Sequence, residues 1–199
     1  MSQQSPTITW ETVQETIVGH FTTEDRKATI GHVMTMRNFF EGWFTGECLI
    51  AFRRGFPHAA LDSNTNYQDF PKPDIVLSSG ICICIMALKH IGTYSAEASS
   101  RWDGGKNSTV AKDVHDLMVH SDRSCIKRVL VFYGPALETA HSPGQCCDPG
   151  RAFCFCLQCS LDHLRQTLAE QWKCRMPEPE RIPLLQTDVD NFYLLVFSI

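Results

Sequence analysis

The feature that most constrains the fold is an uninterrupted apolar run from Ile81 to Leu88. Both faces of this run are apolar, which is typical of a strand buried at the centre of a sheet. A second β-type run, residues 74–77, precedes it, and the Ser-Ser-Gly segment at 78–80 predicts a tight turn between them. The two runs therefore predict a β-hairpin whose second strand is central.

The spacing of apolar residues elsewhere predicts helices packed around this hairpin. Helices are expected over 10–20, from 24 to about 44 with a break at Gly42 or Gly46, over 47–53, over 108–118 and over 161–172. Further strands are expected over 126–133, 153–157 and 192–199, whereas 57–73 and 138–151 are rich in loop-forming residues. This order of elements predicts an α/β fold with a mixed central sheet flanked by helices.

Length and composition favour an ordinary globular protein. The chain has 199 residues, of which 43% are hydrophobic and 20% charged, so one domain over 1–199 is expected. No apolar run approaches the ~18 residues of a membrane helix. The polar start of the chain does not resemble a signal peptide, so we expect an intracellular protein, cytoplasmic or nuclear, whose ten cysteines are reduced thiols.

Three charged residues and one alanine form the constellation that carries chemistry. Glu47 lies in a predicted helix, Asp74 begins the first strand of the hairpin, and Lys89 ends the second. Side chains alternate along a strand, so position 87, which is Ala87, shares a face with Lys89. Because a hairpin brings the start of its first strand near the end of its second, we expect Asp74, Ala87 and Lys89 to converge, with Glu47 approaching from the helix.

This arrangement, with Pro73-Asp74 before the hairpin and Ala87-Leu88-Lys89 at its end, resembles the PD-(D/E)XK nuclease superfamily. The resemblance covers roughly residues 46–118 and implies a restriction-endonuclease-like fold. It also implies that Glu47 and Asp74 bind Mg²⁺ or Mn²⁺, and that Lys89 contacts the attacking water and the scissile phosphate. Hard divalent ions prefer carboxylate oxygens and stabilise charge on the oxygens of a phosphodiester, so these residue types suit that chemistry.

Ala87 departs from the family pattern, which asks for Asp or Glu at this position. A methyl group cannot bind a metal, so the catalytic constellation lacks one acid and cleavage by this chain is expected to be impaired. Three explanations stay open. The residue is an engineered replacement of an acid, or the site has decayed naturally to a binding module, or the acid has migrated, for which Glu97 is the nearest later carboxylate.

The resemblance implies nucleic acid as the partner, DNA rather than RNA, and many relatives act as homodimers. Arg101, Lys106 and Lys112 flank or occupy the helix after the motif, where such proteins approach the substrate backbone; an ordinary solvated helix face is the equal alternative. The formal net charge of −4 is unusual for a duplex-binding protein, so binding would require a local basic strip. Membrane binding is not expected.

A cysteine cluster is the second chemical signal, within an elaboration of the domain around 138–160. Thiols and imidazoles at short spacings suit tetrahedral Zn²⁺, but buried apolar cysteines explain the cluster equally simply, since no pair of clean CxxC knuckles is present. The cluster consists of Cys146, Cys147, Cys154, Cys156 and Cys159. The second functional hypothesis is accordingly a non-catalytic nucleic-acid- or protein-binding module on the same fold, with structural zinc as its stabiliser.

Overall fold

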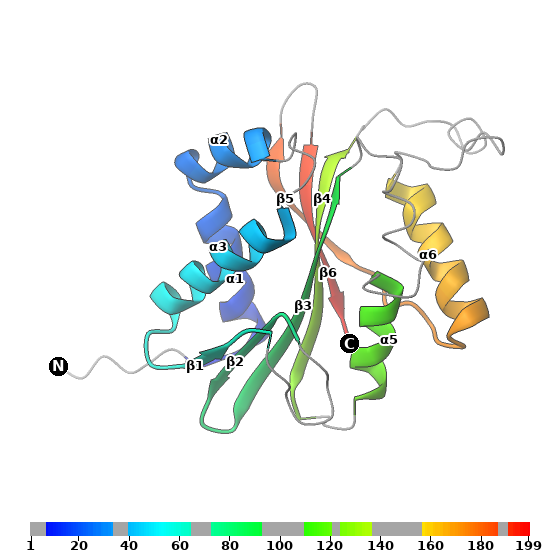
Figure 1. Ribbon diagram of the computed structural model, residues 1–199, viewed down its shortest axis with the longest axis horizontal. Coiled ribbons are helices and arrows are strands. Elements are labelled where there is room, and N and C mark those ends of the chain that lie inside the picture. The colour runs from blue at the N-terminus through cyan, green and yellow to red at the C-terminus, as the bar shows by residue number, and fades with distance from the viewer. Residues whose placement is uncertain are drawn as a thin grey trace.

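The computed structural model describes residues 7–33, 40–64, 73–92, 110–120, 124–136, 157–186 and 191–199. Six strands form one mixed sheet with helices on both of its faces (Figure 1). The helices are α1 (Trp10–Phe21), α2 (Glu24–Val33), α3 (Phe40–Gly55), α5 (Val110–Val119) and α6 (Leu157–Gln171). The strands are β1 (Ala60–Asp62), β2 (Ile75–Ser79), β3 (Cys82–Gly92), β4 (Ile126–Ala136), β5 (Glu180–Gln186) and β6 (Asn191–Ser198). The expected α/β architecture with a mixed sheet between helices is confirmed at this level.

The sheet has the order β1-β2-β3-β4-β6-β5, so β3 and β4 are central. Strands β3 and β4 are parallel, and the other neighbours are antiparallel. The expected hairpin is present, because Ser79 pairs with Cys82 across a turn in which Gly80 has a φ of +59°. That backbone conformation is readily adopted by glycine, which explains the turn at this point.

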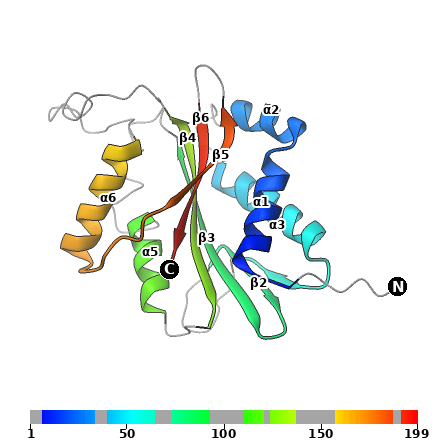
Figure 2. The same cartoon turned by 180° about the vertical axis from the view of Figure 1, so that it is seen from behind.

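Each face of the sheet carries its own hydrophobic core. Helices α1, α2 and α3 lie over one face and α5 and α6 over the other, as Figures 1 and 2 show from opposite sides. Met86 and Leu88 of β3 belong to the first core, together with stacked Phe44 and Phe132, whose ring centroids lie 3.8 Å apart. Ala87 belongs to the second core. Strand alternation thus assigns the residues of β3 to two different environments.

The start of helix α1 is set by an N-terminal cap, and its orientation by one buried face. Thr9 caps the helix: its hydroxyl accepts a hydrogen bond from Thr12 N, and Thr12 Oγ1 accepts one from Thr9 N. Its buried residues Val13, Ile17 and Phe21 recur at a spacing of one helical turn. Within the described residues, no helix combines the length and apolarity needed to cross a bilayer.

Several expected boundaries are wrong. Helix α3 continues through Gly42 and Gly46, because Phe44, Cys48 and Phe52 bury a continuous face. Strand β3 extends beyond Lys89 to Gly92, because it pairs with β4 along its whole C-terminal half. Leu157 begins α6 rather than ending a strand, and residues 153–156 lie outside the described residues.

Two strands, β1 and β5, were not predicted from the sequence. Strand β1 occupies three residues of the expected 57–73 loop and pairs with β2. Strand β5 contains Pro183, and its register with β6 shifts between Pro183 and Leu185. Proline lacks the N–H needed inside a ladder, so it argues against a central strand but is tolerated at an edge, which is where β5 lies.

Candidate functional site

Asp74 is fixed at the sheet by the hairpin register. It directly precedes β2, whose first residue Ile75 pairs with Met86 of β3. This places the Asp74 carboxylate beside the next residues of β3, where its Oδ2 accepts a hydrogen bond of 2.6 Å from Leu88 N. The expected proximity of Asp74 to the Ala87-Leu88-Lys89 segment is therefore present in the structure.

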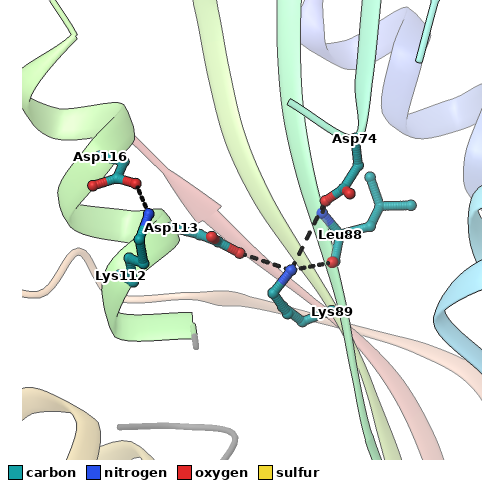
Figure 3. A network of polar contacts seen from close by, with 6 residues as sticks. All are labelled: Asp74, Leu88, Lys89, Lys112, Asp113 and Asp116. Atoms are coloured by element: carbon teal, nitrogen blue, oxygen red, sulfur yellow. Dashed lines mark hydrogen bonds and ion pairs between the residues drawn. The ribbon is translucent and has the colours of Figure 1, made fainter. Parts of the chain in front are cut away.

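Lys89 is a buried cation surrounded by oxygen atoms (Figure 3). Its side chain is 6% exposed, and Nζ lies 3.0 Å from Asp113 Oδ2 and 3.9 Å from Asp74 Oδ2. Nζ also donates a 2.9 Å hydrogen bond to the main-chain oxygen of Leu88. Removing an ammonium from water is costly unless it is paired and hydrogen-bonded, and these three oxygens provide that compensation.

Asp113 of α5 is the residue that the sequence analysis missed as part of the site. Burial raises the pKa of the Asp113 carboxyl to about 6; Lys89 opposes this rise and the charge of Asp74 adds to it. A signal for it was present in the sequence. Asp113 lies on the apolar stripe formed by Val110, Val114 and Leu117, at the i+3 position, where an acid is unusual.

Ala87 lies on the same face of β3 as Lys89, as expected. It is 3% exposed and packs in the core beneath α5 and α6 with Val129 and Val131. The methyl group therefore stands beside the cluster of Asp74, Lys89 and Asp113 without contributing a polar atom.

Glu47 is not brought to this cluster. It lies on α3, over the opposite face of the sheet (Figure 2), where its Oε2 is 2.7 Å from His20 Nε2 and its Oε1 is 3.0 Å from Arg26 Nη1. Phe44, one turn earlier on α3, packs into the core of that face and orients the helix. Glu47 thus ties α3 to α1 and α2.

Of the remaining candidate residues, one lies on α5 and most of the others fall outside the described ranges. Lys112 pairs with Asp116 along α5, one residue before Asp113 in the chain (Figure 3). His90, next to Lys89 in the chain, faces the opposite core, where its ring stacks on Phe44 with 5.8 Å between the ring centroids. Those outside the described residues are Glu97, Arg101, Lys106, Cys146, Cys147, Cys154 and Cys156; Cys159 lies on α6 with its side chain undescribed.

The cysteines that the structure describes are free thiols. Cys48 and Cys84 are buried, and Cys82 is half-buried on the same face of β3 as Cys84. Desolvation raises the pKa of the Cys84 thiol to about 12, and it raises that of Cys48 further, with help from the neighbouring charge of Glu47. These two thiols are accordingly protonated core residues.

The fold and this cluster define an α/β protein with a six-stranded mixed sheet between two helical layers and a buried lysine held by two carboxylates. Comparison with protein-family models, with curated protein sequences and with solved structures gives no match.

Proposed function

We propose that the chain carries the site of a divalent-metal-dependent nuclease of the PD-(D/E)XK type, centred on Asp74 and Lys89. The observation that supports the proposal is their proximity: Lys89 Nζ lies 3.9 Å from Asp74 Oδ2, beside the face that carries Ala87. The order of elements supports it as well, because a helix, a hairpin with a central second strand and a further helix follow one another as in the resemblance.

The donor atoms suit a hard ion. Asp74 offers a carboxylate, and the Leu88 main-chain oxygen lies beside it, near the Lys89 amine. A bound Mg²⁺ or Mn²⁺ would supply charge stabilisation to the phosphate and lower the pKa of a water ligand. Lys89 would orient that water and stabilise the anionic transition state electrostatically. In the reaction the water would give up a proton to solvent as its oxygen bonds to phosphorus, the bond from phosphorus to the leaving oxygen would break, and the leaving oxygen would take up a proton from solvent.

DNA is the substrate that we propose, with RNA as the alternative polymer. The described residues offer Lys112 as one cation on the exposed side of α5, next to the proposed site. Its pairing with Asp116 is a surface interaction that a phosphate can displace at little cost.

A non-catalytic binding module is the second candidate, favoured by two observations. Ala87 offers no ligand atom, and the ammonium of Lys89 is already engaged by Asp113 at 3.0 Å. On this hypothesis the polar cluster serves only to hold α5 against β3, and restoring an acid at position 87 creates no activity.

The test is a cleavage assay with Mg²⁺ or Mn²⁺ on plasmid DNA, single-stranded DNA and RNA. The unmodified chain is compared with Ala87→Glu and with the double variant Ala87→Glu/Asp74→Asn. We expect Ala87→Glu to cleave DNA faster than the unmodified chain and the double variant to lose that gain, which excludes a contaminating nuclease. If Ala87→Glu binds the ion but cleaves neither polymer, the binding module replaces the enzyme as the better account.

A further inference from the structure

The site has a gap at Ala87 and a carboxylate beside it that the family pattern does not provide. Asp113 comes from α5 and reaches the same nitrogen that Asp74 approaches, since Lys89 Nζ lies within ion-pair distance of both carboxylates. Figure 3 shows the two aspartates pointing at Lys89 from opposite sides, one from the start of β2 and one from the helix. The helix therefore delivers an acid to the face on which position 87 should have provided one.

The three oxygens around Nζ form the kind of donor set that a hard cation requires. They belong to Asp113, to Asp74 and to the main chain at Leu88, at 3.0, 3.9 and 2.9 Å from Nζ respectively. Counting the described residues, two carboxylates around one ammonium leave the cluster with an excess of negative charge. Oxygen ligands that include carboxylates and a carbonyl are those that Mg²⁺, Mn²⁺ and Ca²⁺ select.

An ordinary structural ion pair explains Asp113 less well. Its Oδ2 is buried, and within the described residues the ion pair with Lys89 Nζ at 3.0 Å is what compensates for its desolvation. Replacing a buried ion pair by apolar residues is often neutral or stabilising, so an apolar residue would continue the stripe of α5 at no greater cost. Asp116, one turn later, shows the alternative, because it pairs with Lys112 nearer the solvent.

We propose that Asp113 supplies the second metal-binding carboxylate of the site, in place of the acid that is absent at Ala87. The inference rests on the proposed function and deepens it, because it assigns metal binding to the unmodified chain. Of the three explanations for Ala87, it selects migration of the acid, with Asp113 rather than Glu97 as the residue that took over the role.

Binding of Mn²⁺ to the whole chain, measured by calorimetry and by electron paramagnetic resonance, tests the proposal without an activity readout. Asp113→Asn preserves the shape of the side chain, and we expect it to weaken Mn²⁺ binding by more than the ~10–100-fold that loss of an outer-shell partner causes. Asp116→Asn, on the same helix, is the matched control and should change the affinity less than twofold. Ala87→Asp added to Asp113→Asn should restore binding, because it returns the acid to the family position.

A second pair of variants covers the case in which Asp113→Asn does not fold. Lys89→Met removes the ammonium that occupies the space between the carboxylates, and we expect it to bind Mn²⁺ at least as tightly as the unmodified chain. The double variant Lys89→Met/Asp113→Asn removes both charges of the buried Lys89–Asp113 pair, so it should fold. It should no longer bind Mn²⁺.

The outcomes separate this proposal from the proposed function. If Asp74→Asn abolishes binding and Asp113→Asn does not, or if only Ala87→Asp binds Mn²⁺, Asp113 has no such role while the Asp74 site stands. If neither the unmodified chain nor Ala87→Asp binds Mn²⁺, the metal-dependent function fails together with the inference.

Discussion

The two faces of the sheet each hold a buried charge, and they neutralise it in opposite ways. On the α1–α3 face one carboxylate, Glu47, has two nitrogen-bearing partners, His20 and Arg26. On the α5 face one ammonium, Lys89, has two carboxylate partners, Asp74 and Asp113. Within the described residues, the acid of the first cluster has two nitrogen-bearing partners, whereas carboxylates outnumber cations in the second. On the proposal above, the second cluster is the one that would receive a further cation.

The largest expected effect is a loss of folding stability when the Glu47 cluster is disrupted, with Mn²⁺ binding unchanged. Glu47→Ala leaves Arg26 without its buried partner, and removal of one member of a buried pair costs about 3–5 kcal/mol. Urea unfolding should therefore show a clear loss of stability, while Mn²⁺ binding to the folded fraction should not change. Glu15→Ala, at an exposed position of α1, is the control and should stay within about 0.5 kcal/mol of the parent. A loss of Mn²⁺ affinity in Glu47→Ala would return Glu47 to the metal site.

The next largest effect concerns the role of Lys89 in cleavage, which the Glu47 cluster has no counterpart for. In the Ala87→Glu background, Lys89→Met removes a positive charge from the reacting phosphate, and loss of one such stabilising group lowers the rate by about 10²–10³-fold. Lys112→Met, also a lysine beside the site but paired at the helix surface, should reduce cleavage much less. Equal losses in both variants would indicate that the two lysines act through general attraction to the polymer. That result would contradict a specific role for Lys89.

The smallest effect concerns the thiols beneath the α1–α3 face. Cys82 and Cys84 lie on the same face of β3, but only Cys84 is fully buried. Because burial raises its thiol pKa to about 12, Cys84 should resist iodoacetamide at pH 8 in the folded protein, whereas half-buried Cys82 should react. Mass spectrometry of the labelled peptides measures both residues in one sample. Equal labelling of the two thiols would show that this face opens readily.

The sequence predicted the features that depend on local pattern. The apolar run from Ile81 predicted a central strand, the Ser-Ser-Gly segment predicted the hairpin turn, and the alternation of side chains placed Ala87 with Lys89. The proximity of Asp74 to Lys89 followed from these local features, because the hairpin register alone determines it.

The features that the sequence did not predict depend on tertiary packing. Glu47 has the residue type and helical setting of a metal ligand, but the packing of Phe44 against Phe132 directs its helix to the opposite face. Asp113 reaches Lys89 only because α5 packs against β4, over the face of the sheet that carries Ala87 and Lys89, and no spacing in the chain predicts that packing. Strand β5 is defined by its pairing with β6, which outweighs the poor strand preference of its proline.

The central claim is that the carboxylates of Asp74 and Asp113 form one cation site. In the unliganded chain the Lys89 ammonium lies between them. A crystal structure of the unmodified chain soaked with Mn²⁺ tests it most directly, because the anomalous signal of the ion locates it without assumption. The account predicts one strong peak between the Asp74 and Asp113 carboxylates, about 2.0–2.2 Å from an oxygen of each as for other divalent ions of this size. A structure in which Lys89 keeps both carboxylates and the manganese binds elsewhere, or not at all, would contradict it.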